Sequence, residues 1–203
     1  TIGGTGVYRN SAATPTASLT SLTVNNTNAT GVTLSVPLSV SGTLTMTSGI
    51  INTTTTNLLT LGTATAGGTL AGTPSATSMV RGPFARTISN ANANTNYLLF
   101  PVGKVAYAPI WAAPATTAAT VMKAETFDSN TGTQSAAITN MATNRRWELP
   151  VVSGAITDIN ARVGDAGILA TSIPVQAPAA SAEYTSSFGS VATVVVGTAT
   201  EAA

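Results

Sequence analysis

Residues 41–62 read SGTLTMTSGIINTTTTNLLTLG, and this stretch decides the fold. Here, as through most of residues 19–61, apolar residues such as Leu44 and Met46 alternate with Ser or Thr. A period of two is typical of β-strands with one buried face. Glycines punctuate these strands, as turns require, at Gly31, Gly42, Gly49 and Gly62.

The alternation repeats at a longer interval, close to 20 residues. Leu22/Val24 recur as Leu44/Met46 after 22 residues, and Leu38/Val40 recur as Leu59/Leu61 after 21. Such a repeat predicts a β-solenoid, in which each turn lays its inward residues on those of the turn before. We predict two clear turns and a degenerate third, with Leu70, Met79 and Val80 pointing inward. A simple hairpin meander is the alternative.

Threonine takes the place of charge in this region. No Lys, Arg, Asp, Glu or His occurs between Arg9 and Arg81, whereas residues 1–80 contain 22 Thr. Threonine is β-branched and its hydroxyl bonds water or a neighbouring Thr, so stacked Thr suits the outer face of a strand. Hydroxyl groups therefore keep this half of the chain soluble.

The composition excludes several classes of function. Charged residues make up 7% of the 203 residues, against about 25% in an average protein, and the net charge of +1 does not indicate nucleic acid or an anionic membrane as a partner. The absence of Cys and His excludes thiol nucleophiles, disulfides, histidine acid–base catalysis and most zinc sites. No apolar run approaches the ~18–20 residues that span a bilayer. The chain starts at Thr1 without a basic leader, so we expect a mature or excised segment.

The composition changes at Arg81, because fourteen of the fifteen charged residues lie from there onward. Turn signals separate short strand-like runs at regular spacing, which predicts an Ig-like antiparallel β-sandwich. We expect its strands at 84–88, 97–102, 107–112, 119–127, 145–149, 156–163, 168–173 and 190–196, with Trp147 in the core. The predicted organisation is an extended segment (1–18), a β-solenoid (19–90) and the sandwich (91–203), joined at SNANANTN (89–96).

Four stretches carry a resemblance to a known family. They are VTLSVPLSVSGTLTMTSGIINTTTTNLLTLG (32–62), MVRGPFARTI (79–88), NYLLFPVGK (96–104) and RRWELP (145–150). Together they resemble a repeat unit of the large β-strand-repeat adhesins and gliding-motility-type surface proteins of Bacteroidetes. The resemblance covers about residues 20–197 and implies secretion by the type IX system, a cell-surface location and repetition. The sorting domain typical of type IX substrates does not occur in this sequence.

Acidic residues are the main candidates for catalysis, because glycoside hydrolysis requires two facing carboxyl groups. The pairs Glu125 with Asp128 and Asp158 with Asp165 each bracket a predicted turn, so we interpret them as turn and loop residues. The remaining acids are Glu148, Glu183 and Glu201. Solenoid polysaccharide lyases place acids and bases on the coil surface, and this coil has none. We therefore predict no catalytic, cofactor-binding or metal-binding residues.

Four weaker motifs also occur in the sequence. Asp128-x-Asn130-x-Gly132 begins like a calcium loop but lacks the distal Glu. Lys104 or Lys123 is a candidate for an isopeptide bond to an Asn, assisted by Glu125. Gly103-Lys104 does not match the phosphate-binding loop, since Leu98 and Val105 stand where it needs Gly and Ser or Thr. Glycosylation-type triplets begin at Asn25, Asn28 and Asn52 and fit chance in a chain so rich in Asn and Thr.

These observations favour a non-enzymatic extracellular structural protein on the bacterial cell surface, a fibre subunit or adhesin repeat. Its expected partners are copies of itself, head to tail, or neighbouring repeats, and surface glycans are a further possibility. The contact would use TIGGTGVY (1–8) or the final strand SVATVVVG (190–197) to complete an open strand edge of the next unit. The alternative is a carbohydrate- or ice-binding module that uses the Thr-rich face. An extracellular glycan-active enzyme using the acids of residues 125–165 is a weak third.

Overall fold

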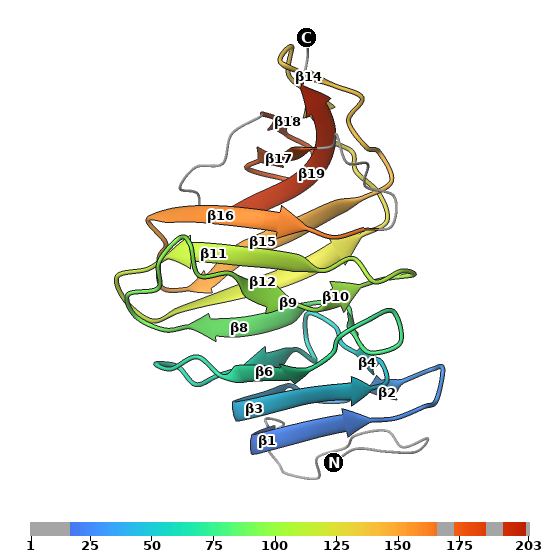
Figure 1. Cartoon of the computed structure of the whole chain (residues 1–203), viewed down its shortest axis with the longest axis vertical. Coiled ribbons are helices and arrows are strands. Elements are labelled where there is room, and N and C mark those ends of the chain that lie inside the picture. The colour runs from blue at the N-terminus through green and yellow to red at the C-terminus, as the bar shows by residue number, and fades with distance from the viewer. Residues whose placement is uncertain (1–16, 166–172, 186–192, 202–203) are drawn as a thin grey trace.

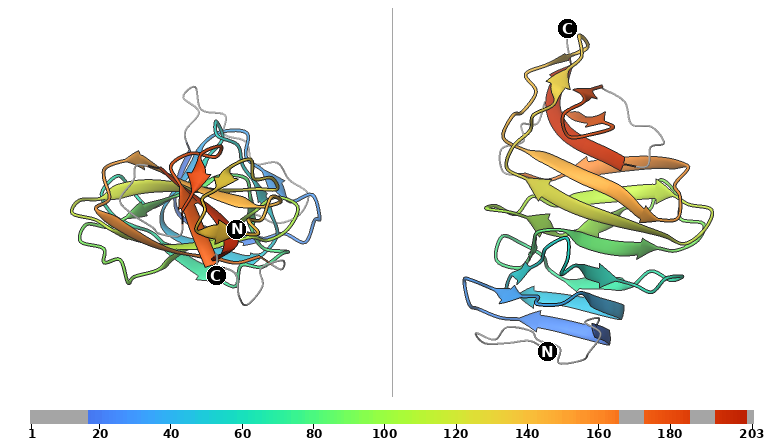
Figure 2. Two further views of the ribbon diagram at one scale, coloured as in Figure 1. Left: turned by 90° about the horizontal axis from the view of Figure 1, so that it is seen from above. Right: turned by 180° about the vertical axis from the view of Figure 1, so that it is seen from behind.

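The structure, a computed structural model, describes residues 17–165, 173–185 and 193–201. These residues form an all-β fold, and none of them lies in a helix. Most strands run across the long axis of the molecule and follow one another along it, from β1 at one end to β15 and β16, whereas the last part of β19 rises along this axis at the other end (Figures 1 and 2). No helix able to cross a membrane occurs in the part of the chain that the structure describes.

The first half is a β-solenoid, as the repeat predicted, and it has about four turns. Each turn contributes strands to two parallel stacks. One stack holds β1 (Ala17–Asn25), β3 (Leu38–Ser48), β5 (Leu59–Leu61), β6 (Thr69–Gly72) and β8 (Phe84–Ile88). The other holds β2 (Val32–Thr33), β4 (Ile51–Asn52), β7 (Val80–Arg81) and β10 (Val102–Gly103). A fourth turn, over residues 84–103, thus follows the three that the repeat indicated.

The predicted register is confirmed. Leu22 pairs with Leu44 and Val24 with Met46, the 22-residue shift. Leu38 pairs with Leu59 and Val40 with Leu61, the 21-residue shift. All eight side chains are buried, and so are Met79 and Val80, while Leu70 is partly buried. Stacking like on like therefore builds one continuous apolar column through the coil.

Glycine is required where the chain turns between the two stacks. Gly49 has a φ of +104°, and a Cβ there would lie 2.3 Å from the carbonyl oxygen of Asn26 in the turn below. Gly31 has a φ of +75°, and a Cβ there would lie 2.4 Å from the Ile50 carbonyl oxygen. Both positions combine a left-handed backbone with a close approach, so any side chain would push adjacent turns apart.

The second half continues the same stack with antiparallel strands. β8 pairs with β12 (Thr120–Phe127), which pairs with β15 (Arg146–Ser153), which pairs with β19 (Thr193–Glu201). Beside them lies a three-stranded antiparallel sheet of β9 (Leu98–Phe100), β11 (Ile110–Ala115) and β16 (Asp158–Val163). The remaining strands are β13 (Thr133–Gln134), β14 (Ile138–Thr139), β17 (Ile173–Ala177) and β18 (Glu183–Tyr184).

One hydrophobic core runs through both halves, from Ala17 to Ile159. The fourth turn of the solenoid spans residues 90 and 91, where we predicted a domain boundary. The segment 89–96 is tied to the second half by its asparagines, since Asn92 Nδ2 donates to the Pro114 carbonyl at 2.7 Å. An Ig-like sandwich over 91–203 is not confirmed, because these strands extend a sheet that begins in the solenoid.

Trp147 lies in the core, as predicted. Its side chain is fully buried, and its Nε1–H donates to the Ala108 carbonyl oxygen at 2.7 Å. Leu149 is buried on the same face, while Arg146 and Glu148 form an ion pair on the other. Alternation along β15 thus follows the sequence pattern.

The final strand, proposed above as a segment that pairs with another unit, already has partners within its own chain. Val195 and Val196 of β19 pair with β15 on one side and with β17 on the other. Its other described residues each pair with one strand, β15, β17 or β14. Residues 190–192 lie outside the described residues, as does most of the expected strand 168–173; β17 begins at Ile173.

Candidate functional site

The outer face of the first stack carries hydroxyl groups in short columns that cross the turns. Strand pairing aligns three such columns: Ser18–Ser39–Thr60, Ser21–Thr43–Thr69 and Thr23–Thr45. Beside the first column lies a hollow of about 310 Å³, lined by Ser18, Ser39, Ser41, Thr60, Thr63 and Thr87 among others. This is the Thr-rich face on which the binding-module hypothesis depends.

These columns are short and uneven. Ala85 follows Thr60 in the first column, and Ala71 follows Thr45 in the third. The pairing of β1 with β3 also slips between Leu19 and Ser21. The face therefore offers hydroxyl groups beside a hollow rather than a flat, regular array.

The first turn leaves a strand edge open among the described residues. There β1 pairs with β3 alone, and β2 with β4 alone. Pro37, the one proline of residues 19–40, lies just before β3, whose edges are both paired, so it does not protect this edge. β1 itself contains no charged residue. Protection of natural edges usually relies on such residues.

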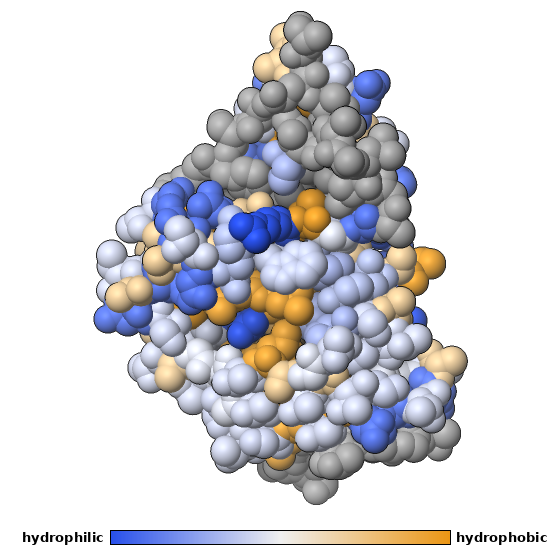
Figure 3. Space-filling view, viewed as in Figure 1, coloured by the Kyte–Doolittle hydropathy of each residue, from blue (hydrophilic) through white to orange (hydrophobic). Residues whose placement is uncertain are grey.

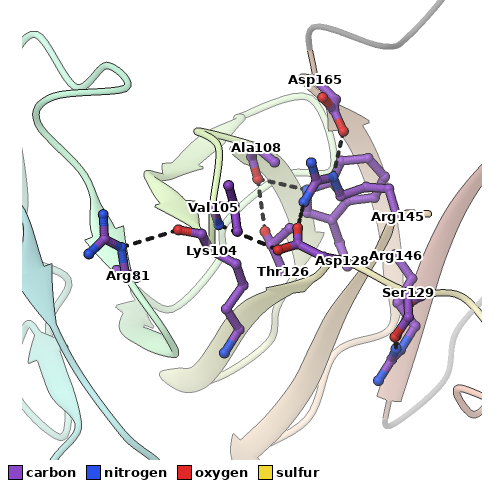
Figure 4. Close-up of polar contacts among 11 residues, drawn as sticks. Arg81, Lys104, Val105, Ala108, Thr126, Asp128, Ser129, Arg145, Arg146 and Asp165 are labelled. Atoms are coloured by element: carbon purple, nitrogen blue, oxygen red, sulfur yellow. Dashed lines mark hydrogen bonds and ion pairs between the residues drawn. The ribbon is translucent and has the colours of Figure 1, made fainter.

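The acidic residues are brought together in a different way from the predicted pairs. Arg145 joins Asp128 to Asp165: its Nη1 contacts the first carboxylate and its Nε lies 2.5 Å from the second (Figure 4). Arg145 is 11% exposed and so is Asp165, whereas Asp128 is 37% exposed. The cluster holds the loops around residues 128 and 165 against the start of β15.

Glu125, the proposed partner of Asp128, instead binds Lys104, with Nζ and Oε1 2.6 Å apart. This contact supplies the lysine and the acid of the isopeptide hypothesis. No asparagine bonds to Lys104 within the described part of the chain. Lys123 lies on the outer face of β12, partly exposed.

Asp158, the proposed partner of Asp165, also forms hydrogen bonds with other groups. It accepts a hydrogen bond from Asn94 Nδ2 at 2.6 Å and one from the Ile159 amide. Glu148 pairs with Arg146, and Glu183 is exposed on β18. The side chain of Glu201 lies outside the described residues. Each carboxylate of the two pairs thus bonds to a group other than the acid it was paired with.

The calcium-like motif is used structurally. Asn130 is buried, its Oδ1 accepts from the Gly132 amide, and its Nδ2 donates to the Ala142 carbonyl. Asp128 is bound to Arg145. Over the described ranges, no three acidic side chains gather where a metal ion would fit.

One residue escaped the sequence analysis. Arg86 stands in an inward column between Leu61 and Met122, and it is 6% exposed. The sequence did offer a signal for it: Arg86 is a charged residue at an inward position of the strand within MVRGPFARTI (79–88).

Comparison with known proteins gives no relative: no family profile, curated protein or solved structure matches this chain. Its function must therefore be argued from its own residues.

Proposed function

We propose that this protein is a non-enzymatic, extracellular structural subunit, a self-associating fibre component or a repeat of a bacterial surface adhesin. The observation that carries the proposal is the edge of β1 that has no partner strand among the described residues; β1 has nine residues, none of them charged and none a proline. An unguarded edge presents backbone donors and acceptors to another chain. The Bacteroidetes-type resemblance of residues 20–197 supports the surface location and secretion. We also propose that the antiparallel half forms an Ig-like sandwich that serves as a spacer between repeats.

The contact is head to tail. The segment that completes β1 of the next unit is residues 1–8, which lie outside the described residues, or the final strand. We favour residues 1–8, because β19 already has a partner strand at each of its residues 193–201. Such a heterologous contact does not close on itself, so it yields a fibre between chains or a stalk within a tandem array.

Light scattering and electron microscopy at increasing protein concentration test this contact. Ser18→Lys places a charge on the open edge strand and should reduce association while leaving the unit folded. Ser39→Lys is the matched control, because Ser39 is the register partner of Ser18 on β3, whose edges are both paired. Deleting residues 1–8 should have the same effect as Ser18→Lys. A monomeric wild-type protein at high concentration contradicts the fibre and leaves only the tandem stalk.

A second candidate function rests on the hollow beside the first hydroxyl column. A carbohydrate- or ice-binding module would use Ser18, Ser39 and Thr60 there. Its test is binding of neutral oligosaccharides, or inhibition of ice recrystallisation, by wild type and by Ser39→Val. Loss of either activity in the variant supports this candidate.

A further inference from the structure

The third and fourth turns of the solenoid separate on one face of the molecule. β5 and β8 pair through residues 59–61 and 84–86, but within the described residues β6 pairs only with β3 and β9 only with β11. A hollow of about 400 Å³ opens between β6 and β9, lined by Gly68, Thr69, Leu70, Tyr97, Leu98 and Leu99 among others. Figure 3 shows an apolar patch over these strands, with a strongly hydrophilic spot inside it.

Arg86 lies at the base of this hollow and links its two sides. Its Nη1 donates to the Leu99 carbonyl at 2.7 Å, on β9, and its Nη2 donates to the Gly68 carbonyl at 3.2 Å, next to β6. The guanidinium group therefore stands where backbone hydrogen bonds between the strands would otherwise lie.

The charge of Arg86 has no counter-charge in the described structure. No carboxylate bonds to it there, and its buried Nε–H has no hydrogen-bond partner. Burial lowers the pKa of Arg86 to about 10, because desolvation disfavours the charged form. Arg145 makes the contrast, since two carboxylates bind it. Besides its two carbonyl acceptors, the guanidinium has only the ring of Phe100 nearby among the contacts of the described residues, with the guanidinium carbon 6.0 Å from the ring centroid. A buried cation with such neutral partners is stabilised by an anion.

The residues that line the hollow around Arg86 suit a sugar that carries a negatively charged group. Tyr97 lines the hollow, and the guanidinium carbon of Arg162 lies 3.8 Å from its ring centroid, which adds a second cation at the rim. Arg86 also borders a smaller adjoining hollow of about 160 Å³, lined by Ser89, Asn92 and Asn96 among others. Aromatic and aliphatic walls receive the apolar face of a sugar ring, and amides and hydroxyls receive its hydroxyl groups.

We propose that the hollow between β6 and β9 binds an acidic glycan, with the carboxylate of a uronic acid residue against Arg86 and its ring against Tyr97 and Leu98. This site differs in place and in chemistry from the hydroxyl face, and it does not depend on self-association. The neutral polar groups of the adjoining hollow favour a sugar over a peptide carboxylate, which would call for further backbone partners.

Calorimetry and NMR titration with oligogalacturonides test the site. The matched ligand is the same oligomer as its methyl ester, which keeps the rings and removes the charges. The free acid should bind at least about tenfold more tightly, since hydrogen bonds to a charged group are stronger than neutral ones. Binding should perturb the amide resonances of residues 69–72 and 97–99. Equal affinity for acid and ester, or perturbation elsewhere only, overturns the proposal.

Variants separate a specific site from general charge attraction. Tyr97→Ala removes a wall of the hollow without touching Arg86 and should weaken binding about tenfold. Arg86→Lys keeps the charge but not the two-armed geometry and should also weaken it. Lys123→Gln removes one positive charge on the outer face of β12 and should leave affinity unchanged. An equal loss in Tyr97→Ala and Lys123→Gln, or tighter binding of a peptide with a free C-terminal carboxylate, contradicts the proposal.

Discussion

The two halves of the molecule share one sheet but differ in their content of charged residues. Residues 17–80 contain no charged side chain, whereas all four ion pairs of the described residues lie between Lys104 and Asp165. The difference follows from strand direction and repetition. In the solenoid like residues stack on like about 4.8 Å apart, so a repeated charge would repel itself in each turn, while a repeated hydroxyl would not.

Antiparallel strands bring unlike sequences side by side and can compensate charge locally. Glu125 and Glu148 are register partners on β12 and β15, a pairing of like charges. Each has its own cation, since Lys104 binds Glu125 and Arg146 binds Glu148. The guanidinium of Arg146 also lies 4.0 Å from the ring centroid of its own partner, Phe127. Charged residues are thus tolerated in the antiparallel half, because neighbouring strands of different sequence provide residues of opposite charge.

The largest expected effect comes from placing a charge inside the solenoid. Leu44→Asp puts a carboxylate in a fully buried column and should lower the free energy of unfolding by roughly 4 kcal/mol. Thr43→Asp is the control on the same strand, since Thr43 faces outward. Chemical denaturation measures both, and an unchanged stability for Leu44→Asp would contradict the register.

A smaller effect is expected from removing a charge in the antiparallel half. Arg145→Gln leaves Asp128 and Asp165 without their shared cation and should cost about 2 kcal/mol, because the group is mostly buried while Asp128 is partly screened by solvent. Arg162→Gln, on the rim over Tyr97, is the control. If the two variants unfold at the same denaturant concentration, the cluster around Arg145 contributes no stability.

Alkaline pH should weaken the fold through its buried tyrosines, since burial raises the pKa of Tyr107 and of Tyr184 alike to about 12. Burial raises the pKa of Tyr184 to about 12, so the unfolded chain loses this proton near pH 10 while the folded chain keeps it. Stability should therefore fall as pH rises from 10 to 12. Tyr184→Phe removes a buried hydroxyl that lies near Asn130 without a hydrogen bond of good geometry to the described residues, so it should cost under about 1 kcal/mol at pH 7 and reduce the alkaline loss. Denaturation of both proteins at pH 7 and 11 measures this; equal alkaline losses would show that Tyr184 is not responsible.

Replacing the acids near the turn at residue 128 should have no effect on polysaccharide hydrolysis. Glu125→Gln combined with Asp128→Asn should release the same amount of reducing ends from polysaccharides as wild type, namely none, because each carboxylate is bound to a cation. The double variant should lose some stability through the same contacts. Hydrolysis by wild type that disappears in the variant would make the protein an enzyme.

Much of the fold followed from local pattern. Alternation placed Leu22, Leu44 and Leu59 in the core, and the 22- and 21-residue intervals predicted which residues lie opposite each other, because turns of equal length repeat the same geometry. Trp147 and the strand at 84–88 also followed from alternation and from flanking turns. These features depend on neighbours close in sequence or one repeat away.

Other features depended on contacts that no spacing reveals. The joining of Asp128 to Asp165 by Arg145 unites loops that alternation left separate. The pairing of Val195 and Val196 with both β15 and β17 likewise joins segments far apart in the sequence. The burial of Arg86 arises because β6 and β9 separate there. The sequence by itself determined the solenoid and its register, since both arise from a repeated local pattern. Only the tertiary structure decided where unlike segments meet, because ion pairs, paired edges and hollows depend on which distant strands become neighbours.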